Sequence, residues 1–220
     1  MPEGLSPEEI IEIYRKFDAW WFFDYYRGNP QAPHVELTSG LCSDGYINSS
    51  LVMSDPKVCH ILAVELAYRC ANLGIEPAWV VGSAYAAITF SYELARVMGA
   101  RHGFTEKDPA DPKRMRWPQL TIPQDVPVLQ CEELITTSQT TEEVRRAIKA
   151  ENQEQPMNFL PYVATAVYRP PTEGITGPIQ VIRLVERVVK TWQPVHCPLC
   201  ASGSPRFRPK EHWAQLTGKA

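Results

Sequence analysis

The sequence predicts an α/β fold in which a mostly parallel, twisted sheet is flanked by helices. Short apolar runs alternate with helix-length segments from about residue 78 to residue 189. Strands joined by helices of this length are typical of a parallel sheet covered on both faces. The chain has 220 residues, of which 44% are hydrophobic and 21% charged, and these values suit one α/β domain with decorations.

The N-terminal part is expected to form a helix and a small hood. Ser6 is followed by a proline and two glutamates, the pattern of a helix start with a capping box, and the helix is expected to continue through the aromatic run at 20–23. Residues 34–53 are expected to form short paired strands, because turn signals ending in Gly40 and Gly45 interrupt them.

The core is expected to consist of alternating helices and strands. Helices are expected from Asp55-Pro56 to Gly74, over 84–98, and from Thr140 or Thr141 to about 150, with strands at 78–82, 101–105, 127–131, 161–168 and 179–189. The segment 106–118 contains three prolines and several charged residues, which predicts a solvated loop. The expected division is an N-terminal helix and hood over 1–55, a core over 56–190 and a tail over 191–220.

Composition argues against several classes of protein. The net charge of -3 gives no basic field for nucleic acid, and no segment approaches the roughly 20 uninterrupted apolar residues of a membrane span. The first residues lack the basic start and apolar run of a signal peptide. The six cysteines are scattered except for Cys197 and Cys200, so we expect the cytosol rather than a secreted disulfide scaffold.

The pair Cys197 and Cys200 could be half of a zinc knuckle. A structural zinc site needs four ligands, and spacing alone finds no second pair, so zinc would require His196, His212 or a dimer mate. A plain pair of thiols in the tail is the alternative. His34 is expected to be an ordinary loop residue.

The most informative segment follows the strand expected at 127–131. The neighbouring carboxylates of Glu132 and Glu133 precede a run of hydroxyl residues from Thr136 to Thr141 that leads into a helix. A helix start with free N–H groups and nearby hydroxyls can bind phosphate. Carboxylates can accept hydrogen bonds from sugar hydroxyls or bind hydrated Mg²⁺. The simpler alternative is a helix cap beside an acidic surface pair.

This segment resembles the signature of type I phosphoribosyltransferases, in which a strand and an acidic pair precede a Thr/Gly/Ser loop and a helix. Other segments are similar, in the same order, to parts of the orotate phosphoribosyltransferases. They are the N-terminal segment at 34–48, the pyrophosphate loop at 81–85, the start of the mobile catalytic loop at 104–107, the base-facing arginine at Arg169 and the tail at 196–200.

The resemblance implies transfer of ribose 5-phosphate from 5-phosphoribosyl-1-pyrophosphate to orotate or a similar base, with Mg²⁺ as cofactor, in a cytosolic homodimer. It also implies roles for individual residues. The 5-phosphate would be wrapped by Thr136, Thr137, Ser138, Gln139 and Thr140, and the ribose hydroxyls would be bound by Glu132 and Glu133. Pyrophosphate would be faced by Ser83, Ala84 and Tyr85, and Lys107 would reach it when its loop closes. The base would be faced by Tyr46, Ile47 and Arg169.

The sequence departs from the family pattern in ways that leave a second hypothesis open. Ser138 and Gln139 stand where glycine is usual, and Ala86 and Ala87 follow the pyrophosphate loop where many relatives place a lysine. Glycine permits close approach of backbone to phosphate, whereas Gln139 brings a Cβ and a long side chain. The alternative is therefore a catalytically weakened member of the fold that binds a nucleotide or the donor as a sensor or partner.

Overall fold

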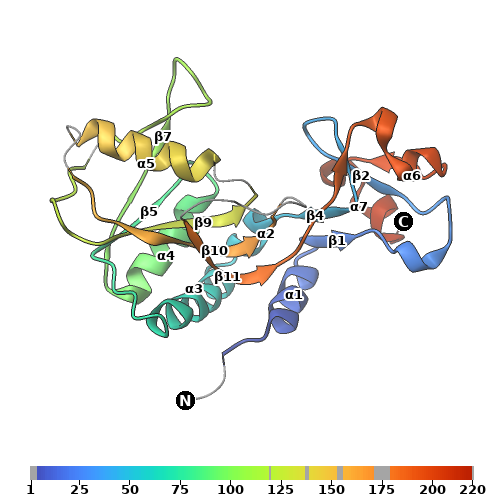
Figure 1. Ribbon diagram of the computed structural model, residues 1–220. Coiled ribbons are helices and arrows are strands. Elements are labelled where there is room, and N and C mark those ends of the chain that lie inside the picture. The colour runs from blue at the N-terminus through green and yellow to red at the C-terminus, as the bar shows by residue number, and fades with distance from the viewer. Residues whose placement is uncertain (1–3, 119, 137–138, 153–155, 171–178, 220) are drawn as a thin grey trace.

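The computed structural model describes residues 4–118, 120–136, 139–152, 156–170 and 179–219. Figure 1 shows two lobes, a larger one that holds the main sheet and a smaller one in which the N-terminal segment and the C-terminal tail lie together. Within the described residues, no helix combines the length and the apolar character that a membrane crossing requires.

The larger lobe is built on a five-stranded parallel sheet, which confirms the predicted fold class. Its strands are β5 (Trp79–Gly82), β6 (Arg101–Phe104), β9 (Val128–Ile135), β10 (Phe159–Tyr168) and β11 (Gln180–Glu186). They lie in the order β11-β10-β9-β5-β6, and every neighbouring pair is parallel.

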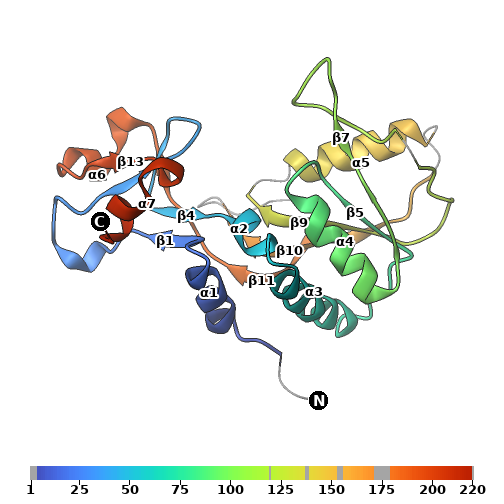
Figure 2. The same cartoon turned by 180° about the vertical axis from the view of Figure 1, so that it is seen from behind.

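Helices cover both faces of this sheet, as Figure 2 shows from behind. On one face, α3 (Pro56–Ala71) and α4 (Ala87–Met98) pack against Val80 and Leu129, and α1 (Pro7–Lys16) packs near β11. On the other face, α5 (Gln139–Glu151) packs against Trp79. Side chains alternate between the faces of a strand, so neighbouring residues of β5 serve two separate cores.

The N-terminal helix begins as predicted but ends earlier. Ser6 and Glu9 form the capping box. The expectation that the helix continues through the aromatic run is wrong, because the chain turns at Asp18, whose φ is 52°. Residues Trp20–Phe22 then form β1, which pairs antiparallel with β4 (Gly45–Ile47), a conformation that aromatic side chains favour.

Three other predicted boundaries are corrected by the structure. Residues Ser49–Met53 form a short helix, α2, where strands were expected. The strand expected to end at 131 continues to Ile135. The segment 106–118 is a loop only in part, since β7 (Glu106–Lys107) pairs with β8 (Met115–Arg116). That hairpin is anchored because the side chains of Met115 and Trp117 are buried in the core beneath α5.

The smaller lobe joins the segment after β1 to the C-terminal tail in one sheet. Its strands β2 (His34–Glu36), β3 (Cys42–Ser43), β12 (Thr191–Trp192) and β13 (Arg206–Phe207) lie in the order β12-β3-β2-β13. The lobe also holds the 3-10 helices η1 (Tyr25–Arg27) and η2 (Pro194–His196) and the helices α6 (Pro198–Ala201) and α7 (Pro209–Thr217).

Gly82, at the end of β5, is required by the close approach of α4. A Cβ placed on Gly82 would collide with Ser91 Oγ and lie 2.9 Å from Ser91 Cβ. We expect Gly82→Ala to lower the free energy of unfolding by about 1 to 3 kcal/mol, the usual cost of overpacking. Chemical denaturation of Gly82→Ala, Ser91→Gly and the double variant measures the free energies of unfolding. Gly82→Ala should cost less stability in a protein that already carries Ser91→Gly. If the costs of the two substitutions simply add, the collision with Ser91 is not the cause of the loss.

Candidate active site

The candidate site lies at the carboxyl ends of β5 and β9. From β5 the chain passes through α4 to β6 on one side, whereas β9 lies on the other side of β5 and leads on to β10 and β11. The strand order therefore reverses between β5 and β9. Ligands of open α/β sheets bind at such a reversal, beyond the carboxyl ends of the strands.

Glu132 of β9 bridges this reversal to the loop after β5. Ser83 Oγ donates a hydrogen bond of 2.5 Å to Glu132 Oε2, and Gln130 Nε2 donates one of 3.0 Å to Oε1. Burial raises the pKa of Glu132 to about 7, although these two hydrogen bonds and the charge of Lys107 oppose the rise. The carboxyl group is thus poised between its neutral and ionised forms near neutral pH.

Glu133 has different surroundings, because successive residues of a strand point to opposite faces. Its side chain is partly exposed, and its backbone carbonyl accepts a hydrogen bond of 3.3 Å from Ser49 Oγ in α2. Burial raises the pKa of Glu133, while N–H groups of its own backbone and of Leu134 lower it. The two carboxylates that are adjacent in the sequence therefore approach the site from different faces of β9.

The loop after β5 presents backbone to the same edge. Ser83 and Ala84 are buried, Tyr85 is exposed, and the Ala84–Tyr85 peptide bond is cis. Helix α4 begins directly afterwards, and among the described residues no side chain caps its first turn. The free N–H groups of such a turn attract anions.

Thr105 adds an unsatisfied polar group beside this loop. Its backbone N–H donates to the carbonyl oxygen of Gly82 at 3.0 Å. The hydroxyl oxygen of Thr105 is fully buried and finds no hydrogen-bond partner within the described part of the chain. Buried polar atoms are almost always hydrogen-bonded, so this hydroxyl is suited to a bound water, ion or catalytic role.

The predicted phosphate-binding segment is described only in part. Thr136 follows β9 directly, and Gln139 and Thr140 are exposed residues of the first turn of α5. Thr137 and Ser138 lie outside the described residues. The start of α5 therefore adjoins the carboxyl end of β9, the position that suits an anion held by a helix N-terminus.

Lys107 lies at the base of the β7-β8 hairpin. It is half-buried in β7 opposite Met115, and its charge lowers the pKa of Glu132. Helix α5 fastens the hairpin, since the N–H of Met115 donates to Glu143 Oε1 at 2.9 Å and Arg146 Nη2 donates to the carbonyl of Met115 at 3.3 Å. The hairpin that carries Lys107 is thereby held against α5.

Arg169 supplies a second cation at this edge. It directly follows β10, and its backbone N–H donates to the carbonyl of Ile135, the last residue of β9, at 2.8 Å. Its side chain is half-buried, and burial lowers the pKa of the guanidinium. No hydrogen bond or ion pair to this guanidinium occurs among the described residues, so a positive charge is left available for an anionic ligand.

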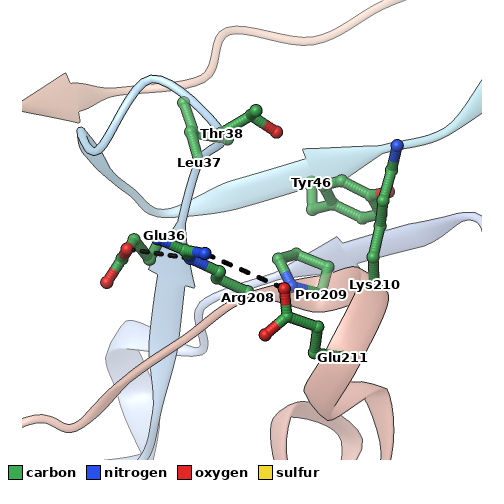
Figure 3. A pocket seen from close by; sticks show the side chains of 8 residues that line it. All are labelled: Glu36, Leu37, Thr38, Tyr46, Arg208, Pro209, Lys210 and Glu211. Atoms are coloured by element: carbon green, nitrogen blue, oxygen red, sulfur yellow. Dashed lines mark hydrogen bonds and ion pairs between the residues drawn. The ribbon is translucent and has the colours of Figure 1, made fainter.

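The other two residues predicted to face the base, Tyr46 and Ile47, lie in β4. Ile47 is buried in the main core, whereas Tyr46 lines a cavity of about 270 Å³ between β2, β4 and α7. Figure 3 shows this cavity with Lys210 beside Tyr46 and with Arg208, whose Nε donates to Glu36 Oε1 at 3.0 Å. Within the described part of the chain, no hydrogen bond or ring contact links Tyr46 to Arg169.

Arg208 and Lys210 were not singled out from the sequence. They belong to no motif, and only the pairing of β13 with β2 brings α7 over the N-terminal segment. The one sequence signal for them is that basic residues occur in the C-terminal tail.

The chain is similar over nearly its whole length to orotate phosphoribosyltransferases. It is 31% identical over 205 residues to the orotate phosphoribosyltransferase of Desulforamulus reducens, covering 93% of this chain and 97% of that protein. It is 30% identical over 176 residues to that of Carboxydothermus hydrogenoformans, covering 80% and 88%. The chain belongs to the orotate phosphoribosyltransferase family. No family model matches it.

A solved structure of the same family supports the fold. The orotate phosphoribosyltransferase of Aeropyrum pernix superposes with a TM-score of 0.56 at 14% identity, covering 80% of this chain and 93% of that one. At this identity the likeness concerns the fold alone. The predicted family and the predicted fold class are thus both confirmed.

Proposed function

We propose that this protein transfers ribose 5-phosphate from 5-phosphoribosyl-1-pyrophosphate to orotate and releases pyrophosphate. The observation that carries the proposal is the bridge between Ser83 and Glu132, which places a buried acidic strand end at the reversal of the sheet. Membership of the orotate phosphoribosyltransferase family over 93% of the chain supports it. The base forms a new N–C bond to the sugar as the C–O bond to pyrophosphate breaks.

The residues proposed to surround the ribose of the donor suit this reaction. Positive charge develops on the ribose in such a transfer, and the carboxylates of Glu132 and Glu133 can stabilise it electrostatically. The first turns of α4 and α5 offer N–H groups to the pyrophosphate and the 5-phosphate of the donor. Catalysis would then depend mainly on positioning and on charge complementarity.

The residues at this edge also fit Mg²⁺ bound together with the donor. The carboxylate of Glu132 presents oxygen atoms at this edge, and the hydroxyl of Thr105 at the end of β6 has no hydrogen-bond partner among the described residues. Mg²⁺ prefers oxygen ligands that include substrate phosphates and water. Bound Mg²⁺ would neutralise charge on the leaving pyrophosphate. Lys107 would add a protein cation for the same group.

Arg169 is proposed to bind the carboxylate of orotate, because a guanidinium matches a carboxylate with two parallel hydrogen bonds. We expect Arg169→Ala to raise the KM for orotate by about 10- to 100-fold, the value of one charge-assisted contact, and to leave donor affinity unchanged. Steady-state kinetics and calorimetry with the donor measure the two effects. Arg183→Ala, which removes an exposed arginine paired with Glu186 on β11, is the matched control. An equal loss of donor affinity in Arg169→Ala would contradict the assignment.

The activity itself is tested by mixing the protein with the donor, Mg²⁺ and orotate and following the loss of orotate absorbance. Uracil and purine bases serve as comparison substrates. Absence of turnover with all of them would remove the proposal. The homodimer remains a prediction from the family resemblance, and the cytosolic location remains a prediction from the N-terminal sequence and the cysteines.

A second candidate is a member of the family that binds the donor or a nucleotide without turnover. It is favoured by Ala86 and Ala87, because the start of α4 carries no cation of its own. Calorimetry separates the two functions. Donor binding without turnover supports the second candidate, and absence of binding contradicts both.

A further inference from the structure

Four potential metal ligands from distant parts of the chain meet in the smaller lobe. The ligand atoms of His34, Cys42, Cys197 and Cys200 all lie within 4.8 Å of one another. His34 Nε2 lies 3.4 Å from Cys200 Sγ and 3.7 Å from Cys197 Sγ, and Cys42 Sγ lies 3.6 Å from Cys200 Sγ. All of these cysteines are free thiols, and their sulfurs are much further apart than the roughly 2.05 Å of a disulfide.

These distances are those of a tetrahedron around zinc. Zn–S bonds of about 2.3 Å and Zn–N bonds of about 2.0 Å imply edges of about 3.8 Å between sulfurs and about 3.5 Å between sulfur and nitrogen. We propose that His34, Cys42, Cys197 and Cys200 form a structural zinc site that joins the N-terminal segment to the C-terminal tail. Three thiolates and an imidazole leave no open position, which is the arrangement of structural rather than catalytic zinc.

The hydrogen bonds of His34 leave its Nε2 free to bind the metal. Ser204 Oγ donates to the carbonyl oxygen of Ala32 at 2.5 Å, so it accepts from His34 Nδ1–H at 2.8 Å. The proton is thereby held on Nδ1, and the lone pair of Nε2 faces the sulfurs. Histidines that bind metals typically donate their other N–H to such a partner.

The surroundings also compensate the charge of a zinc centre with three thiolates, which is about -1 by the charges of its parts. The Arg206 guanidinium lies 3.9 Å from Cys42 Sγ, and the N–H of Cys200 donates to Cys197 Sγ at 3.5 Å. A cation and a backbone donor thus already point at the sulfurs.

The hydrophobic cluster of the smaller lobe is small. Among the described residues it consists of the buried residues Cys42, Cys197 and Leu199, with Phe23, Trp192 and Cys200 packed against them. Small units that cannot bury a large core commonly use a metal instead, and the free energy of metal binding then stabilises the fold. Zinc here would fasten β2 and β3 to the turn at α6.

The cluster corrects two expectations from the sequence. The expectation that His34 is an ordinary loop residue is wrong, because it is fully buried in β2. The suggested ligands His196 and His212 are not part of the cluster. His196 is exposed, and His212 contacts Phe207 and Glu211.

Metal analysis of the untagged protein, purified from zinc-supplemented medium without chelators, tests the site. We expect one zinc per chain, and we expect Cys197→Ser and Cys42→Ser to retain less than about a tenth of it, since each removes one of four ligands. Cys70→Ser, which changes a buried cysteine of α3 outside the cluster, should keep the full amount. Zinc-free protein, or equal loss in Cys70→Ser, would overturn the proposal.

A second pair of variants guards against loss of zinc through misfolding. His34→Cys offers a fourth thiolate and should retain zinc, whereas His34→Ala should lose it. Cobalt substitution should give the visible bands of a tetrahedral thiolate site, altered in His34→Cys. Retention of zinc in His34→Ala at the level of the unchanged protein would also overturn the proposal. Every readout is metal content or absorption, so failure here is distinct from failure of the proposed transferase activity.

Discussion

Replacing Lys107 with alanine is expected to lower kcat by about a hundredfold or more, the usual effect of removing a charge that stabilises a transition state. Lys107 is half-buried at the base of the β7-β8 hairpin and close enough to Glu132 to lower the pKa of that carboxyl group. Negative charge grows on the pyrophosphate as it leaves, so the contribution of Lys107 should be greater in the transition state than in the bound donor.

Steady-state kinetics of Lys107→Ala and Lys113→Ala distinguish transition-state stabilisation by Lys107 from a general effect of removing a positive charge from the hairpin. Lys113 is an exposed residue of the same hairpin, so its loss should change kcat less than about twofold, as expected for a solvated charge. Lys107→Arg should recover part of the activity. If kcat of Lys107→Ala stays within a few-fold of the unchanged protein, or if its Tm falls sharply, Lys107 is structural.

The sequence predicted the elements whose signals are local. The capping box of Ser6 and Glu9 and the side-chain cap of Asp55 are set by residues within one turn, and both helices begin where these caps predict. Apolar runs such as Val80-Val81 also identify strands that are buried on both faces.

The acidic end of β9 shows where local signals fail. A carboxylate after an apolar run predicts the end of a strand, yet Glu132 continues β9 into the protein interior. It is tolerated there because Ser83, far away in the sequence, and Gln130, two residues earlier, donate hydrogen bonds to its two oxygens. The partnership with Ser83 depends on the pairing of β5 with β9 and could not be predicted from spacing.

The cluster of His34 and three cysteines could not be predicted from the sequence either, because it too depends on strand pairing between distant segments. Cys197 and Cys200 have the spacing of a metal-binding pair, but His34 and Cys42 are more than 150 residues away and have no such spacing. Parallel pairing of β13 with β2 and antiparallel pairing of β12 with β3 bring the two halves together. A ligand set divided between strands of different segments leaves no pattern in the sequence.

The second large effect is expected at Glu132, where function and stability should oppose each other. Burial raises the pKa of this carboxyl group from 4.5 to about 7 in the folded protein, so the folded state binds the proton more tightly than the unfolded state does. The stability linked to this group is fully present below pH 4.5 and is lost as the pH rises through 7. At pH 8 the ionised carboxylate costs about 3 kcal/mol, the equivalent of a pKa rise of this size.

Glu132→Gln should therefore be more stable than the unchanged protein at pH 8, by up to about 3 kcal/mol, and equally stable near pH 4.5. Glutamine keeps the shape of the protonated carboxyl group and can still pair with Ser83 and Gln130, whereas alanine would leave both without a partner. Because the amide cannot carry the negative charge that the ribose requires, kcat/KM should fall by about a hundredfold or more. Denaturant unfolding at both pH values and steady-state kinetics measure the two effects.

Glu143→Gln is the matched control, since the pKa of Glu143 is displaced the other way. A hydrogen bond from Arg146 lowers the pKa of Glu143 to about 2. The ionised carboxylate of Glu143 therefore stabilises the fold above pH 4.5, and that stability is lost as the pH falls through 2. Its replacement should destabilise the protein at pH 8, opposite in sign to Glu132→Gln. A common sign for the two variants would mean that loss of hydrogen bonds outweighs charge. A stabilised Glu132→Gln with full activity would mean that the buried carboxylate takes no part in the transfer, and Glu133 would then be the only carboxylate of the proposed pair to act on the ribose.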